Sequence, residues 1–193
     1  RPISPEGGSD EARRVGERRK AAFVVWGDYV PPLEPELEVH FEVIRSLDTY
    51  LGAGTFEPYG PGQIQQPTMF EFKLALGEHL GQLTAFASGL ALFERGKHVE
   101  AIALFDTVAQ GADQALNAKM ARAISFYRGT NYLHLGRALD AEPDLRGLVP
   151  DLASSSATWD GIAIAALGNL GLVATHPRDN AAAQDYFQRA LEI

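Results

Sequence analysis

One pattern of small and large apolar residues occurs three times in this chain, at intervals of 40 and 42 residues. The three sets are Gly89, Gly96, Ala101, Phe105 and Val108; Gly129, Gly136, Ala141, Leu145 and Leu148; and Gly171, Arg178, Ala183, Phe187 and Ala190. A period of this length is typical of stacked helix pairs, because one pair cannot bury its apolar face without neighbours. The repeat therefore predicts an array of helical hairpins, a fold class that holds other molecules.

The spacing within each unit has a packing explanation. A small residue in the first helix lets the second helix cross closely, and the alanine twelve positions later makes the reciprocal contact. The large apolar residue four positions after that alanine lies on the same helix face. The pattern resembles the tetratricopeptide repeat (TPR) family over about residues 82–193, in Gly89-Leu92-Gly96-Ala101-Phe105, Gly129-Tyr132-Gly136-Ala141-Leu145 and Leu167-Leu170-Gly171-Ala183-Phe187. This resemblance implies a mainly α fold, a TPR-like α-α superhelix.

Two features depart from the family pattern. The period is longer than the roughly 34 residues usual for the family, which implies longer first helices or longer connections. Residues 114–135 are predicted to form one such long helix, with Asp113 as its N-cap. Proline clashes inside a helix, so the helix that contains Pro143 is expected to begin near Asp140 and to hold the proline in its first turn.

The residues before the repeats have a different character. Residues 1–9 are predicted to be a linker, and residues 10–47 a partial α/β portion with one basic helix and two strands, 23–30 and 37–44. The second run alternates strictly, with Leu37, Val39, Phe41 and Val43 on one face and Glu38, His40, Glu42 and Ile44 on the other. Prolines between the runs indicate a small N-terminal β-hairpin. This order resembles the end of an accessory domain related to the TolB amino-terminal domain, which implies a segment of a larger bacterial signalling protein.

A loop and a further helix are predicted to connect the two portions. Residues 48–67 are rich in glycine and proline and are expected to form a loop. Thr68 and Glu71 suggest a capping box, and an amphipathic helix is expected from Met69 toward Leu80. The helical repeats would then occupy residues 68–193, with strand confined to about 23–45.

Composition limits the functions to consider. With 17 basic and 25 acidic residues the net charge is −8, which argues against nucleic acid as a partner. No apolar run is long enough to span a membrane, and the absence of cysteine suits a reducing cytoplasm. The chain begins with Arg1 and ends within a helical pattern, so it is expected to be part of a larger protein.

Catalytic motifs are not found in the sequence. There is no phosphate-binding G-x-x-x-x-G-K-[ST] loop and no G-x-S-x-G nucleophile motif. The five histidines are scattered without metal-ligand spacing. We therefore expect no enzyme activity, no cofactor and no metal.

The first helices of successive units are expected to line an apolar groove that binds a peptide or helix of a protein partner. The residues predicted for this groove are Phe86, Leu90, Phe93, Phe126, Thr130, Leu133 and His134. Two alternatives stay open: the same face packs against the chain's own N-terminal portion, or it is buried by self-association into a homo-oligomer. The predicted function is a noncatalytic interaction scaffold or regulatory segment. The alternative is a small-molecule sensor, with Trp26 as a ligand platform, that controls an attached enzyme.

Overall fold

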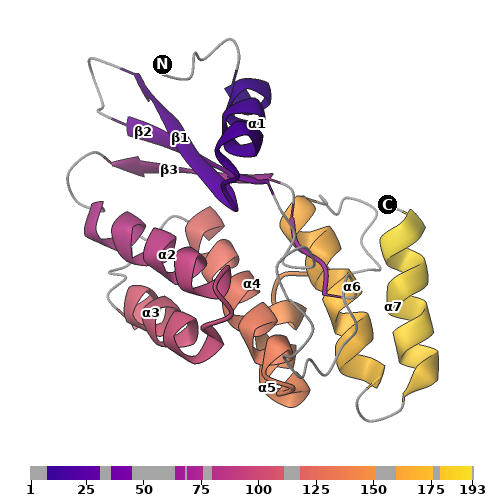
Figure 1. Ribbon diagram of the computed structural model, residues 1–193. Coiled ribbons are helices and arrows are strands. Elements are labelled where there is room, and N and C mark those ends of the chain that lie inside the picture. The colour runs from indigo at the N-terminus through magenta and orange to yellow at the C-terminus, as the bar shows by residue number, and fades with distance from the viewer. Residues whose placement is uncertain are drawn as a thin grey trace.

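The computed structural model describes residues 8–30, 36–44, 64–67, 69–75, 80–110, 118–150, 160–175 and 179–192 (Figure 1). Its elements in chain order are α1 (Gly8–Arg19), β1 (Phe23–Val30), β2 (Glu36–Val43), β3 (Met69–Ala75), α2 (Leu80–Phe93), α3 (His98–Gln110), α4 (Ala118–His134), α5 (Ala138–Arg146), α6 (Gly161–Thr175) and α7 (Asn180–Glu192). The described part of the chain is thus mainly helical with a small antiparallel sheet, as the sequence predicts.

The sheet has the order β1-β2-β3, and both strand pairs are antiparallel. Alternation along β2 directs Phe41 to one face, where its ring lies 5.4 Å from that of Phe86 in α2. On the opposite face Glu42 is fully buried, and its Oε2 lies 3.2 Å from Nε of Arg13 in α1. The sheet is therefore a middle layer between α1 and the helical portion, as Figure 1 shows.

The third strand corrects the prediction for residues 69–75. These residues pair with β2, with Phe70 opposite Phe41, and so are not the helix expected to follow a capping box at Thr68. The sequence Met-Phe-Glu-Phe-Lys-Leu-Ala alternates with the two-residue period of a strand. This two-residue alternation within residues 69–75 agrees with their pairing to β2. The prediction of a helix relied instead on leucines that lie further along the chain. Neither the start of the helical portion at residue 68 nor the limit of strand to 23–45 is therefore correct.

The helices form three successive hairpins, α2 with α3, α4 with α5, and α6 with α7 (Figure 1). A Cβ atom built on Gly89 would lie 2.7 Å from the ring of Phe105, and one on Gly129 would lie 3.0 Å from Leu145. A Cβ on Gly171 would lie 2.5 Å from the ring of Phe187. The repeating glycine and large apolar positions thus meet in all three hairpins, which confirms the contact predicted from the spacing.

The first two hairpins share one turn geometry. Gly96 and Gly136 have φ values of 68° and 71°, in the left-handed region that favours glycine. In the second unit α5 begins at Ala138 directly after this turn, so the prediction of a start near Asp140 is wrong and Pro143 lies inside the helix. Ala138 is almost completely buried, and burial of this apolar residue favours the early start although it leaves a proline in the helix interior. The expected N-cap Asp113 lies outside the described residues, as do residues 1–7 and most of the predicted loop 48–67.

Candidate functional site

The seven residues predicted to line an open groove are buried. Their exposed fractions are 0% for Phe86, Phe93, Phe126, Thr130 and Leu133, 3% for Leu90 and 8% for His134. The expectation that these side chains form an exposed binding surface is therefore wrong.

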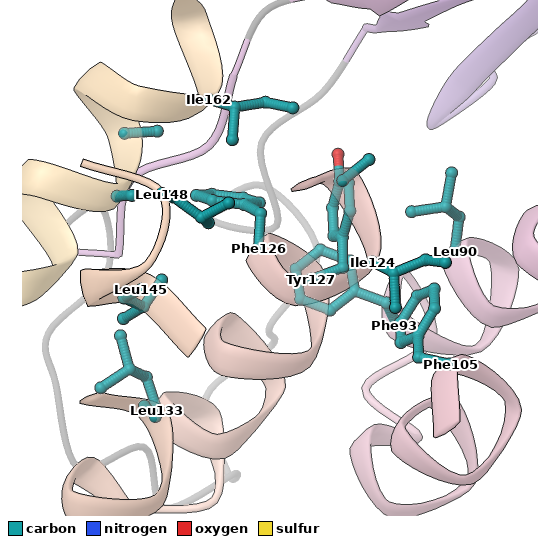
Figure 2. Packing of buried hydrophobic residues seen from close by; sticks show 14 of the residues in the cluster. Leu90, Phe93, Phe105, Ile124, Phe126, Tyr127, Leu133, Leu145, Leu148 and Ile162 are labelled. Atoms are coloured by element: carbon teal, nitrogen blue, oxygen red, sulfur yellow. The ribbon is translucent and has the colours of Figure 1, made fainter. Parts of the chain in front are cut away.

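Two kinds of neighbour cover these positions. Phe86 packs against Phe41 of the sheet, which is the alternative of burial by the N-terminal portion. Phe126 lies beside Leu148, which follows α5, in Figure 2. On the opposite side of α4 the ring of Phe93 lies 5.3 Å from that of Tyr127. The predicted groove is thus the main core of the molecule.

A buried polar cluster lies at the turn end of the first hairpin. The rings of His98 and His134 are stacked, with centroids 4.5 Å apart and planes 2° from parallel. The Nδ1 atom of His98 lies 2.8 Å from Oδ1 of Asn131, whose Nδ2 donates to the Tyr127 carbonyl at 2.6 Å. Burial lowers the pKa of His98 and raises the pKa of Glu94 to about 7. These contacts join the start of α3 to the end of α4.

An ion-pair cluster links successive hairpins. The Arg128 guanidinium of α4 donates from Nη1 to Asp106 of α3 at 2.9 Å and from Nε to Asp144 of α5 at 2.7 Å. One side chain therefore connects three helices, which fixes how the first two units meet.

The candidate functional site is a cavity of about 430 Å³ between α6, α7 and the segment 64–67. Its lining includes Gln66 from that segment, Gly168 from α6, and Phe187, Ala190 and Leu191 from α7. All the lining residues are uncharged. Leu191 is 87% exposed at the C-terminal end of α7, so an apolar surface continues from the cavity to the outside.

The segment 64–67 is held against α6 by a pair of hydrogen bonds. The Gln65 backbone N–H donates to Oδ1 of Asn169 at 2.7 Å, and Asn169 Nδ2 donates to the Gln65 carbonyl at 3.0 Å. A Cβ atom on Gly168 would lie 2.9 Å from Cγ of Gln65, so the absence of a side chain at Gly168 admits this segment. Asn169 is fully buried, and this pairing satisfies its amide group.

Comparison of the three repeat units shows how the residues at the α6–α7 cavity differ from those at the same positions of the first two hairpins. The repeat intervals align Gly168 with Phe86 and Phe126, and both phenylalanines are completely buried. They align Phe187 with Phe105 and Leu145, which are also completely buried, whereas Phe187 is only partly buried. Helix α4 packs against α3, and helix α6 packs against α5. Phe187 and Ala190 of α7 are partly exposed and so less enclosed than the residues at the same positions of the first two units.

Sequence reasoning missed this cavity because its shape depends on how residues 64–67 pack against a helix about a hundred positions later. One signal was available, since Gly168 stands where the two earlier units have phenylalanine. Trp26, the other suggested ligand position, stacks on His40 with ring centroids 4.1 Å apart.

Further features of the described residues bear on function. No three histidine or carboxylate side chains there come close enough together to hold a metal ion. None of the described helices combines the length and the apolar character needed to cross a membrane. Comparison of the chain with models of protein families, with curated proteins and with solved structures finds no match in any of the three.

Proposed function

We propose that this chain is a noncatalytic, TPR-like interaction segment that binds a helix of a partner protein in the apolar cavity between α6 and α7. The observation that carries the proposal is the partial exposure of Phe187 and Ala190, at positions that are buried in the first two units. Absence of cysteine agrees with a cytoplasmic setting, and the proposed role is regulation within a bacterial signalling protein.

The packing of earlier helices indicates where a partner helix would lie. Helix α4 contacts both α2 and α3, and α6 contacts both α4 and α5. Each first helix therefore packs against both helices of the preceding hairpin. By the same geometry a further helix would contact both α6 and α7, and the cavity lies between these two helices. An amphipathic helix packed into an apolar groove is a common mode of recognition.

The exposed residues can supply binding energy. Full enclosure of an apolar side chain the size of leucine contributes about 1.5–3 kcal/mol, and Leu191 is 87% exposed. Phe187 and Ala190 are also partly exposed beside it. A partner helix that covers these three residues would complete the third unit in the way that α4 and α6 complete the first two.

Site-specific cross-linking tests the position of the partner. A photoreactive phenylalanine analogue replaces Leu191 at the cavity or Gln184, an exposed residue of the same helix that does not line the cavity. Partners captured from the source organism are identified by mass spectrometry, and the cross-linked segment is mapped. We expect a helical segment to cross-link at position 191 but not at position 184. Equal cross-linking from both positions would reject the cavity as the docking site.

Binding of the purified partner then measures the energetic contribution of this face. Leu191→Asp places a charge at the apolar rim, and we expect it to weaken binding at least about tenfold, as loss of roughly 1.4 kcal/mol does. Gln184→Asp is the matched control, with the same added charge on α7, and should leave affinity unchanged. Isothermal titration calorimetry measures both, and a partner that binds Leu191→Asp normally contradicts the proposal.

A further inference from the structure

The strand β1 lies at one edge of the sheet, and no strand of the described residues pairs with its outer side. The strand order is β1-β2-β3, and of the described helices and strands only β2 and α1 contact β1. Residues 23–30 pair with β2 without interruption, so no bulge turns this edge away from an approaching chain. An uninterrupted edge strand of this kind is a template for pairing with another polypeptide.

The hydrogen-bond pattern identifies the backbone groups that point away from the sheet. The Ile44 N–H donates to the Ala22 carbonyl at 2.8 Å, and the β1–β2 register continued by one step places these two residues opposite each other. Antiparallel strands alternate between such bonded pairs and pairs whose N–H and C=O groups point outward. The even-numbered residues of β1 therefore bond to β2, and the N–H and C=O groups of Val25 and Gly27 point outward.

The same two residues are exposed on the face of the sheet that packs against the helices. Val25 is 40% exposed, although its partner Phe41 in β2 is completely buried. Gly27 is also exposed, although its partner Val39 is 2% exposed. The helices thus cover this face of β2 and leave the same face of β1 partly open. An apolar residue placed beside Val25 would enclose it further.

The chemistry of the edge determines what can occupy it. Outward N–H and C=O groups at every second residue match the backbone of another extended chain, the mode of recognition known as strand addition. The side chains of β1 suit this pairing, because the strand is rich in β-branched and aromatic residues and Asp28 is its only charged residue. The net charge of −8 opposes pairing of two copies of this chain. The edge therefore favours an extended segment of another protein.

We infer that β1 accepts an extended segment of a partner protein as a fourth strand of the sheet. The segment pairs with the outward backbone groups of Val25 and Gly27, and it places an apolar residue beside Val25 on the face toward the helices. This edge shares no residue with the α6–α7 cavity, so the inference stands or fails independently of the proposed function.

Two short peptides provide a matched pair of probes. Both alternate valine and threonine between terminal serines, and in the second every internal amide is N-methylated, which removes the donors but keeps the side chains. Amide hydrogen exchange of Val25 and Gly27 is followed by NMR on the full chain. We expect an excess of the unmodified peptide to slow this exchange at least about tenfold, and the methylated peptide to have no effect. Unchanged exchange with the unmodified peptide would overturn the inference.

Variants of Val25 keep the test specific to the edge. Val25→Pro removes an outward N–H without removing a bond to β2, and proline is tolerated at such edge positions. It should weaken binding of the unmodified peptide at least about fivefold. Val25→Lys keeps the backbone intact and places a charge on the edge, so it should also weaken binding. Val25→Ile is the matched control with the same backbone and a similar shape, and it should bind as the parent does.

Circular dichroism melting establishes which variants are folded, and normal binding by every folded variant would contradict the inference. Two further outcomes would reject it. Slow exchange of Val25 and Gly27 in the free chain at every protein concentration would show that the chain itself covers the edge. Protection that rises with protein concentration would identify a second copy as the occupant in place of a partner protein.

Discussion

Alanine substitutions at the repeated glycines would test what determines the free-energy cost of crowding a helix crossing. The cost could depend only on the distance from the new Cβ to the nearest side chain, or also on how freely that side chain can move. Gly→Ala in a helix interior gains about 1 kcal/mol from backbone propensity. Overpacking a rigid core costs about 1–3 kcal/mol. At Gly89 the new Cβ would lie 2.7 Å from the Phe105 ring, which is completely buried and packs beside the rings of Phe86 and Tyr127. We expect Gly89→Ala to reduce the free energy of unfolding by about 1 kcal/mol.

Gly171 provides the informative contrast. Its Cβ would lie even closer to a ring, 2.5 Å from Phe187. However, Phe187 is partly exposed and borders the 430 Å³ cavity, so its ring can rotate away. We therefore expect Gly171→Ala to be neutral, or to stabilise by up to about 1 kcal/mol, despite the shorter distance.

Urea unfolding followed by circular dichroism measures both variants. Gly81→Ala is the control, because a Cβ at that position meets no atom within 4 Å. The predicted order of stability is Gly81→Ala and Gly171→Ala above the parent, and Gly89→Ala below it. A larger loss for Gly171→Ala than for Gly89→Ala would refute the reasoning from neighbour mobility.

Three further perturbations test the core and the segment 64–67. Ala141→Leu should overpack the fully buried α4–α5 crossing and destabilise by about 1–3 kcal/mol, so an unchanged urea midpoint would contradict the close crossing. Glu94 has its folded pKa raised from 4.5 to about 7, so its ionisation costs stability as pH rises through this window. Glu94→Gln should therefore be more stable than the parent by on the order of 3 kcal/mol at pH 8 and nearly equal to it at pH 4, with a pH-independent difference as the contrary result. Asn169→Ala removes both hydrogen bonds to Gln65, and should speed hydrogen exchange of the Gln65 amide. Unchanged exchange would show that another contact holds the segment.

The hairpins could be predicted from the sequence because their contacts are nearly local. Gly89 and Phe105 are close along the chain, and the same pair recurs in each unit, so a regular spacing carries the packing information. The third strand was also visible in the alternation of residues 69–75, but a helical stripe extended through the same leucine-rich stretch. The pairing of residues 69–75 with β2 is what decides between the strand period and the helix period.

The site was harder to predict because the exposure of a helix residue depends on which other elements pack against that helix. Phe86 and Phe126 have the apolar character of groove residues, and the sequence does not say whether a sheet, a helix or solvent covers them. In the structure Phe41 packs against Phe86, and the second hairpin and its neighbours enclose Phe126. The cavity appears instead where glycine interrupts the aromatic series, at Gly168.

The hydrogen bonds between Gln65 and Asn169 join residues 104 positions apart. A repeat array in which each unit contacts only its neighbours can begin to fold at any unit and propagate. Here one wall of the third hairpin comes from a segment that precedes all three hairpins, so that wall closes only after a long loop has formed. Loop closure of this length slows folding more than it reduces stability. We therefore expect the α6–α7 hairpin to acquire its native hydrogen-exchange protection last, after the first two hairpins have already formed.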